Sequence, residues 1–275
     1  GFCIYDKLNE KIILSRDFFG EKPLFFSFKN NEFIFGSKIK YLFFFNKNLN
    51  KINDYKIGDY LINGYKSLFK NNNTYFKDIN FVEPGSIIEL DLKNFSLKKN
   101  KINPFSKVSV SKNQEENNKL AKEIFLNEYE KRLRSDVPIS FCLSGGIDSS
   151  ALVSVAKKEF NLNPYCFSII NEDHRYNEFE NINFLKKKLD LDVEFIKIPK
   201  LSLENFVETC KKLISYRCSP ISTISYYIHS YISQACSNKN FKVICSGTGA
   251  DEIFTGYYDH SLFYLNEIKD NNKYL

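Results

Sequence analysis

The chain has 275 residues, 43% of them hydrophobic, and a formal net charge of +6 at pH 7. This length suits one large domain or two smaller ones, and no apolar run approaches the roughly 18 residues needed to cross a bilayer. Lysines scattered along the chain carry almost all of the positive charge, whereas nucleic-acid-binding proteins usually gather lysine and arginine on one face, so the charge does not indicate a nucleic-acid partner.

The seven cysteines form no C-x-x-C pair and lie mostly in apolar runs. This pattern favours reduced, buried thiols, Cys3 among them, over a disulfide or zinc framework. The first residues also lack the basic start and apolar middle of a signal peptide, so a cytoplasmic protein is expected. Methionine is absent even at position 1, which predicts that the chain is part of a longer reading frame.

Residues 1–105 are predicted to be rich in β-structure. Short apolar runs separated by turn residues are typical of antiparallel strands, and residues 37–44 favour a short helix. The expected strands are residues 2–5, 11–15, 23–28, 32–36 and 86–91.

Residues 96–114 are polar with little periodicity and are interpreted as a domain linker. From about residue 115 an amphipathic helix is expected, ending near residues 134–136. Strands and helices then alternate, and continuous apolar strands joined by helical crossovers predict a parallel sheet covered on both faces. The expected strands are 138–143, 165–170, 193–198 and 241–245, and the helices lie near 149–159, 178–189, 202–214 and 223–236.

Residues 143–150 have the sequence LSGGIDSS and follow the first of these strands. A tight Ser-Gly-Gly turn between a strand and a helix can hold an anion, because glycines admit close approach and helix N-terminal amides attract negative charge. Ser144, Ser149 and Ser150 add hydroxyl donors. Asp148 repels phosphate and therefore suggests an intervening Mg²⁺ ion. The competing interpretation is a plain loop in which Asp148 caps the helix.

Residues 245–252 (CSGTGADE) form a second turn of this kind after strand 241–245. Parallel sheets bind ligands at the carboxyl ends of their strands, so the two turns would place Asp148 and Asp251 across one crevice, each able to bind a Mg²⁺ that bridges phosphates. Pyrophosphate beside Mg²⁺ predicts an enzyme that splits ATP between its α- and β-phosphates. A single turn would favour Asp251 and Glu252 as simple helix caps; the pair favours the nucleotide site.

Residues 135–138 (SDVP), 143–150 and 246–257 (SGTGADEIFTGY) closely resemble the asparagine synthase family. Residues 16–26 (RDFFGEKPLFF) and 36–40 (GSKIK) resemble the second half of that family's amidotransferase domain. The resemblance covers about residues 1–265, with its motifs in the family's order.

The resemblance implies an α/β protein of two partial domains. Residues 1–105 would be part of a β-rich class II glutamine amidotransferase domain of the Ntn-hydrolase type, without its N-terminal nucleophile. Residues 115–275 would form an ATP-pyrophosphatase domain of the adenine nucleotide α-hydrolase type, with a parallel sheet and truncated at its C-terminal end.

The resemblance also implies two half-reactions. A substrate carboxylate, aspartate in the namesake reaction, attacks the α-phosphate of ATP, and ammonia from glutamine then displaces AMP to form an amide. The implied nucleotide-binding residues include Leu143 and Ile169 at the adenine and ribose and Ser246 and Gly247 elsewhere on the nucleotide. Those implied at pyrophosphate and magnesium are Ser144, Gly145, Gly146, Asp148 and Ser149, with Asp251 as the second metal ligand. Plain core packing is the competing interpretation of Leu143 and Ile169.

The sequence departs from the family pattern in two ways. Class II amidotransferases use an N-terminal cysteine as nucleophile, and Cys3 is not terminal, so this segment is predicted not to hydrolyse glutamine. The family's adenylation-site lysine would lie beyond Leu275. At Thr248 the family typically has a catalytic glutamate, and threonine cannot act as a base near neutral pH. Arg217 adds a cation near the expected acceptor site, although a solvated surface charge is the favoured interpretation.

Three alternatives to asparagine synthesis stay open: an amidotransferase of this family acting on a sugar acid of surface polysaccharides, a tRNA-modifying ATP-pyrophosphatase, and a non-enzymatic nucleotide-binding remnant. The expected partners are small molecules, with neither nucleic acid nor membrane, and homodimer formation is left open. His174, His229 and His260 share no metal-ligand spacing, so none is assigned to a metal.

Overall fold

The structure is a computed structural model that describes residues 1–68, 70–103, 113–171, 173, 177–199 and 202–270. The chain divides into two compact units. Unit 1 comprises residues 1–110 and 201–227, and unit 2 comprises residues 111–200 and 228–275. Among the described residues, no helix has both the length and the apolar character that crossing a membrane requires.

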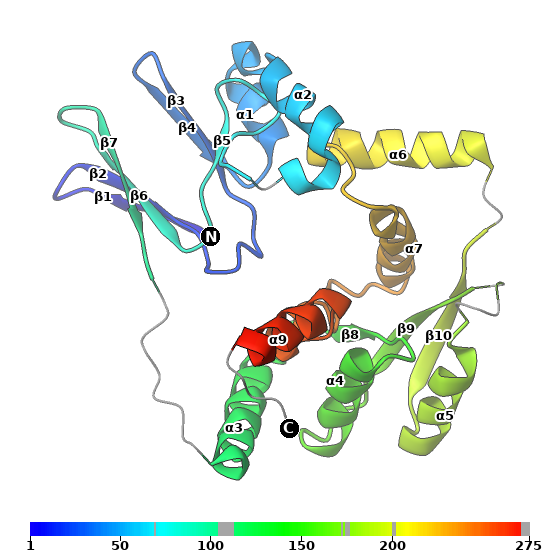
Figure 1. The fold of residues 1–275 in the computed structure, drawn as a ribbon. Helices are drawn as coiled ribbons and strands as arrows, with labels where there is room; N and C mark the ends of the chain where they lie inside the picture. Colours follow the sequence, from blue (N-terminus) through cyan, green and yellow to red (C-terminus); the bar gives the residue numbers. More distant parts are fainter. Residues whose placement is uncertain (69, 104–112, 172, 174–176, 200–201, 271–275) are drawn as a thin grey trace. The chain divides into compact units, whose positions relative to one another are not determined.

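The elements are labelled in Figure 1. In chain order they are β1 (Phe2–Asp6), β2 (Lys11–Ser15), β3 (Phe25–Lys29), β4 (Glu32–Gly36), α1 (Ile39–Phe45), η1 (Lys47–Leu49), α2 (Asp54–Asn63), η2 (Gly64–Ser67), β5 (Asn80–Phe81), β6 (Ser86–Asp91), β7 (Ser96–Lys101), α3 (Gln114–Arg132), β8 (Ile139–Cys142), α4 (Ile147–Lys158), β9 (Tyr165–Ile170), α5 (Phe179–Leu189), β10 (Asp192–Lys197), α6 (Leu203–Arg217), α7 (Ile224–Asn238), β11 (Val243–Cys245), α8 (Ala250–Phe254) and α9 (Tyr258–Asp270).

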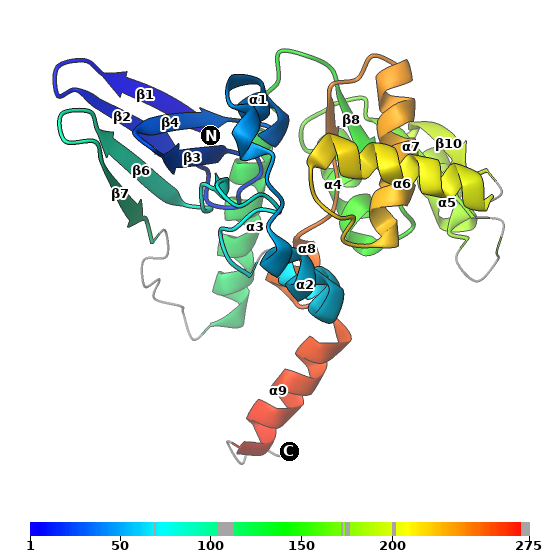
Figure 2. The same cartoon turned by 90° about the horizontal axis from the view of Figure 1, so that it is seen from above.

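Unit 1 contains two antiparallel sheets, one of strand order β1-β2-β6-β7 and one of order β4-β3-β5. The four strands of the first sheet are labelled in Figure 2. A buried cluster joins them, with Leu14 and Ile88 from the first sheet and Phe26 from the second. Burying a side chain of this kind contributes about 1.5–3 kcal/mol, so the cluster is a main source of stability for the unit. The β-rich prediction for this region is confirmed.

Strand β7 corrects the predicted linker at residues 96–114. Residues 96–101 pair antiparallel with β6, with Leu97 opposite Leu90. The strand escaped prediction because it lies at a sheet edge, where only Leu97 packs against the core and the other side chains are polar. Residues 104–112 lie outside the described residues, and α3 begins at Gln114.

Strand β1 forms the other edge of the same sheet, which corrects the expectation for Cys3. The thiol is exposed rather than buried in a core. Phe2, Ile4 and Tyr5 on the same strand are also about half exposed. An apolar run at a sheet edge therefore gives the sequence signature of a buried strand without being buried.

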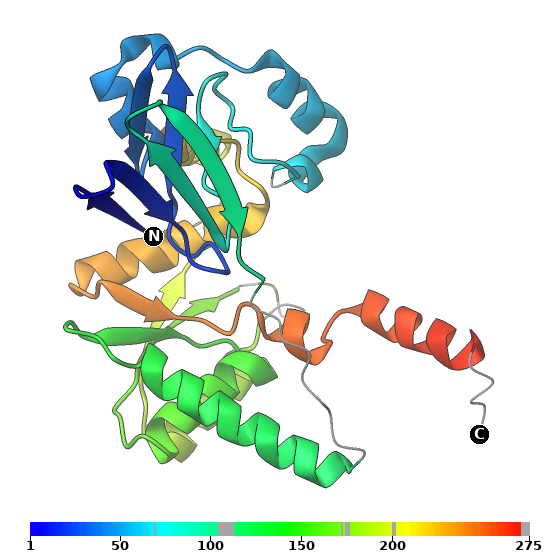
Figure 3. The ribbon, with the colours of Figure 1, turned by 90° about the vertical axis from the view of Figure 1, so that its left-hand side faces the viewer.

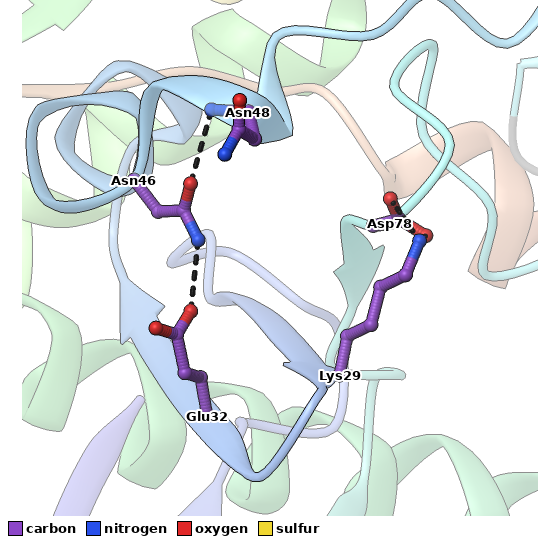
Figure 4. Close-up of polar contacts among 5 residues, drawn as sticks. All are labelled: Lys29, Glu32, Asn46, Asn48 and Asp78. Carbon is purple, nitrogen blue, oxygen red and sulfur yellow. Dashed lines mark hydrogen bonds and ion pairs between the residues drawn. The ribbon is translucent and has the colours of Figure 1, made fainter.

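Asn46 fastens the end of α1 to strand β4 (Figure 4). Its side-chain amide donates to Glu32 Oε2 at 2.8 Å, and its Oδ1 accepts the backbone amide of Asn48 at 3.0 Å at the start of η1. Nearby, both carboxylate oxygens of Asp78 accept hydrogen bonds from Lys29 Nζ, at 2.8 and 2.9 Å. The first contacts tie the β3–β4 hairpin to α1 and η1, and the second ties it to the segment before β5.

Lys56 on α2 is 1% exposed, although neither this helix nor a buried lysine was predicted from the sequence. Its ammonium donates to the backbone carbonyl of Ser67 at 2.6 Å and to Asn71 Oδ1 at 3.3 Å. Burial is the largest influence on the pKa of this lysine and lowers it, while the negative charge of Asp59 partly opposes the shift. Lys56 thus fastens the segment around η2 to α2.

Replacing Lys56 by methionine is expected to lower the free energy of unfolding by about 1–3 kcal/mol, because the Ser67 carbonyl loses its donor. Urea denaturation measures the change. The exposed Lys66 is the matched control, and Lys66→Met is expected to stay within about 0.5 kcal/mol of the parent protein. Equal stability of the two variants would contradict this role of Lys56.

Helix α6 packs within unit 1 although it is distant in sequence from the rest of that unit. Tyr216 accepts a hydrogen bond from Lys38 Nζ at 3.0 Å, and Ser215 accepts one from Lys40 Nζ at 3.1 Å. Tyr60 donates to the backbone carbonyl of Ile221 at 3.1 Å, and Cys218 packs against the buried cluster around α1. Residues 201–227 thereby complete one side of unit 1.

Unit 2 is built on a parallel sheet of strand order β10-β9-β8-β11. Phe141 and Cys166 pack in one cluster with α3, α4 and α5, whereas Phe167 packs with α7 on the opposite face. Figure 3 shows α3 and α4 on one side of these strands and α7 on the other. The predicted parallel sheet with helices on both faces is confirmed, as is the mixed α/β class of the whole chain.

Candidate functional site

The first turn of the candidate site begins where β8 ends. The backbone amide of Leu143 donates to the Phe167 carbonyl of β9 at 2.9 Å, so the chain is held to the sheet until the turn starts. The turn then closes through serines: Ser149 Oγ accepts the Ser144 amide at 3.0 Å and lies 2.8 Å from Ser144 Oγ. Ser144 Oγ also accepts the Gly146 amide at 3.2 Å. The two hydroxyls therefore brace the turn from inside.

The N-terminus of α4 carries no side-chain cap. Gly146 stands at the cap position without a side-chain hydrogen bond, and Asp148 is already the second helical residue. Asp148 is therefore not the helix cap, which removes the plain structural interpretation of that residue. Within the described residues, the amides of Ile147, Asp148 and Ser149 have no acceptor. Unsatisfied amides and the helix dipole make this end attractive to an anion.

The second turn follows β11, the neighbour of β8 in the parallel sheet, with Cys245 opposite Phe141. Ser246 Oγ donates to Thr248 Oγ1 at 3.2 Å, and both residues are exposed. Gly249 precedes α8 with φ of 104°, a conformation that residues with side chains rarely adopt. The turn therefore needs glycine at this position.

The two turns touch each other at Gly247. A methyl group there would lie 2.9 Å from Asp148 Cβ and 2.9 Å from the Ser149 amide nitrogen, so only glycine fits without a shift. The carboxyl ends of two adjacent parallel strands thus bring residues 144–149 and 246–248 into one site. This is the juxtaposition that the sequence predicts.

The two acids expected to bind magnesium come from the two turns: Asp148 lies against Gly247, and Asp251 is in the first turn of α8. Within the described residues, neither the Asp148 nor the Asp251 carboxylate accepts a hydrogen bond or forms an ion pair, although the Asp251 backbone carbonyl accepts the Gly256 amide. Asp251 Oδ1 fills the space that a side chain at residue 256 would need, which explains the glycine there. No group of three metal-binding side chains is found in the described part of the chain. Two free carboxylates suit a Mg²⁺ that takes its other oxygen ligands from phosphates and water.

The comparisons with known proteins match two consecutive segments of the chain. The family model of asparagine synthase matches residues 121–271. The chain belongs to the asparagine synthase family. Residues 1–101 match the model of a glutamine amidotransferase domain. Both matches agree with the motifs found in the sequence.

Curated relatives are similar along most of the chain. Asparagine synthetase (glutamine-hydrolyzing) 1 of Bacillus subtilis is 30% identical over 94% of this chain and 39% of the relative. Putative asparagine synthetase (glutamine-hydrolyzing) 1 of Methanocaldococcus jannaschii is 30% identical over 96% of this chain and 45% of the relative. Amidase chyE of Penicillium rubens is 22% identical over 94% of this chain. The chain thus spans less than half the length of the first two relatives.

The remaining nucleotide residues expected for an asparagine synthase, Leu143 and Ile169, do not come together as side chains. Leu143 is 2% exposed and packs in the cluster of α4 and α5, whereas Ile169 is partly buried against the cluster on the α7 face. Alternation along the strands therefore places the two side chains on opposite faces of the sheet. Core packing explains the Leu143 side chain, which leaves its backbone as the part that can face a nucleotide.

Two of the three histidines take part in hydrogen bonds within the described structure. His260 Nδ1 accepts the backbone amide of Tyr257 at 3.4 Å, next to the start of α9. His229 accepts a hydrogen bond from Ser233 through its backbone carbonyl. His174 lies outside the described residues.

Two residues near the site were not anticipated. Glu178, the residue before α5, accepts the Gly145 amide at 3.0 Å through Oε2. Ser168 on β9 is 1% exposed, and its hydroxyl has no hydrogen-bond partner among the residues that the structure describes. Neither is part of a motif, and the contact of Glu178 spans 33 residues. Only the packing of α5 beside α4 could reveal the contact between Glu178 and Gly145.

Cys142 and Cys166, on the parallel sheet of unit 2, are predicted to be unreactive. Burial raises the pKa of Cys142 to about 11 and that of Cys166 to about 12, so both remain thiols at pH 7.5. Cys3 is exposed, although partial burial raises its pKa as well. Mass-spectrometric mapping of iodoacetamide labelling is expected to find Cys3 modified first and Cys142 and Cys166 modified only after unfolding. Earlier labelling of Cys166 would contradict the described burial.

Proposed function

We propose that the protein is an ATP- and Mg²⁺-dependent amide synthase that joins glutamine-derived ammonia to the side-chain carboxylate of aspartate. The observation that carries the proposal is the contact of Gly247 with Asp148 and Ser149, which unites two glycine turns at the carboxyl edge of a parallel sheet. A nucleotide bound across adjacent strand ends fits this arrangement.

Each part of the site has a role in this proposal. The free amides of α4 and the turn of Ser144, Gly145 and Gly146 bind the pyrophosphate portion of ATP. Ser246 and Gly247 contact the nucleotide from the second turn, and the backbone at Leu143 together with Ile169 borders its adenosine portion.

Asp148 and Asp251 would hold the magnesium ion. When bound, Mg²⁺ would offset the negative charge that develops on the departing pyrophosphate. The carboxylate substrate attacks the α-phosphorus, the bond to the bridging oxygen breaks, and an acyl adenylate and pyrophosphate result. Ammonia then displaces AMP, because adenylation has made the carboxylate oxygen a good leaving group.

Thr248 bears on the second half-reaction. Its hydroxyl accepts a hydrogen bond from Ser246 and cannot remove a proton from the attacking ammonia near neutral pH. The proton must therefore leave by another group or by solvent. This difference from the family's usual glutamate is the reason to test acceptors other than aspartate.

The decisive experiment measures pyrophosphate release by the complete protein with Mg²⁺, ATP, glutamine and a candidate acceptor. Release with aspartate, together with formation of asparagine, supports the proposal. Release only with a uronic acid or its nucleotide conjugate would replace it with sugar-acid amidation by the same site. Nucleotide binding without release on any acceptor would favour a non-enzymatic role.

Glutamine hydrolysis is not assigned to a residue of this chain. Cys3 lies inside β1 and lacks the free α-amino group that class II amidotransferases use as a base. The isolated 275-residue chain is accordingly expected to show no glutaminase activity. Homodimer formation is left open.

A further inference from the structure

The Glu178 carboxylate rests on the turn expected to bind pyrophosphate. Its Oε2 accepts the amide of Gly145 at 3.0 Å. The approach is close, since a methyl group on Gly145 would lie 2.8 Å from Glu178 Cβ and 3.0 Å from Asn181 Cβ. The start of α5 is therefore fitted against the first turn, and glycine at position 145 makes the contact possible.

The Glu178 carboxylate accepts the hydrogen bond of the Gly145 amide, which an incoming phosphate could otherwise accept. Within residues 144–146, the Ser144 and Gly146 amides donate to serine hydroxyls of the same turn, and Gly145 alone donates to an anionic group. Carboxylate and phosphate oxygens are both strong acceptors for backbone amides. Glu178 thus supplies the kind of acceptor that the bound anion would supply.

The charges nearby make this occupancy unfavourable for a second anion. Asp148 lies on the adjoining first turn of α4, and the lysines of α5 are in its last turn, away from Glu178. No lysine or arginine of the described residues forms an ion pair with Glu178. Its exposed side chain is free to rotate into solvent when another acceptor arrives.

We propose that Glu178 competes with pyrophosphate for the Gly145 amide and has to leave it when the nucleotide binds, so that Glu178 lowers the affinity of the site for pyrophosphate groups. This inference rests on the proposed function. Glu178, which lies outside both glycine motifs, would then help to set the affinity of the site for pyrophosphate and for the nucleotide.

The test is calorimetric titration of the complete protein with magnesium pyrophosphate. Glu178→Gln keeps the size of the side chain and removes its charge, and the expected result is binding about five- to tenfold tighter than in the parent protein. The matched control is Glu180→Gln, which removes the same charge from the exposed first turn of α5 and is expected to leave the affinity unchanged.

Salt dependence separates competition from a structural effect. The advantage of Glu178→Gln is expected to shrink as ionic strength rises, because the repulsion it removes is screened. Unchanged or weaker binding by Glu178→Gln, with the parent protein binding normally, would overturn the inference alone. Absence of pyrophosphate binding in the parent protein and in both variants would instead overturn the proposed function. Thermal unfolding of each sample confirms that the variants are folded.

Discussion

Replacing Asp148 by alanine is expected to reduce pyrophosphate release by about a hundredfold or more while leaving the protein folded. A metal held beside a departing phosphate contributes several kcal/mol to the transition state, and each 1.4 kcal/mol corresponds to about a tenfold change in rate. The cost to the fold is small, because the Asp148 side chain makes no hydrogen bond within the described residues and contributes mainly through the helix dipole, about 0.3–1 kcal/mol.

The control for this variant lies at the other end of the same strand. Asp136 is exposed and precedes β8, whereas Asp148 follows it. Asp136→Ala is therefore expected to retain full activity. Activity is measured with the complete protein at saturating ATP, and circular dichroism reports the fold. Survival of activity in Asp148→Ala would falsify the assignment of this residue to magnesium.

Replacing Gly247 by alanine is expected to weaken binding of magnesium ATP by at least about tenfold. The new methyl group would stand 2.9 Å from both Asp148 Cβ and the Ser149 amide nitrogen, so the two turns must separate. Overpacking of this kind costs about 1–3 kcal/mol, and here the displacement falls on the groups proposed to hold the nucleotide. Titration calorimetry measures the affinity.

Two other glycines separate this steric effect from a general effect of glycine replacement. Gly58 lies in α2 with nothing near its substituent position, so Gly58→Ala is expected to stabilise the protein by about 0.4–1 kcal/mol. Gly249 has open space but a φ of 104°, so Gly249→Ala tests backbone strain without a clash. Unimpaired nucleotide binding in Gly247→Ala would contradict the described contact between the turns.

Much of the fold of unit 2 could be predicted from the sequence, because buried parallel strands are continuous apolar runs and their helices have a clear period. Strand β9 was expected at residues 165–170 and lies at Tyr165–Ile170. The neighbouring position of the two glycine turns followed from the same pattern. The expectation for residues 144–149 and 246–248 as one site agrees with the geometry around Gly247.

The predictions failed where an edge or a distant contact decides the structure. Strand β7 was predicted as a linker because most of its side chains are polar and exposed to solvent. Cys3 was predicted to be buried because apolar edge strands and core strands have the same composition. The side chains of Leu143 and Ile169 lie on opposite faces of the sheet because of the strand register, which apolar content alone does not determine. Lys56 and Glu178 act through partners brought near only by the completed fold.

The position of α6 has a consequence for how the protein forms during synthesis. Because residues 201–227 belong to unit 1, the chain leaves that unit, builds most of unit 2 and then returns. The hydrogen bond of the Tyr60 hydroxyl and the packing of the cluster around α1 are completed only when the segment containing Ile221 and Cys218 has been made. On the ribosome, unit 1 therefore remains incomplete through roughly a hundred further residues. A shortened chain ending near residue 113 would lack the contacts that residues 201–227 make in unit 1.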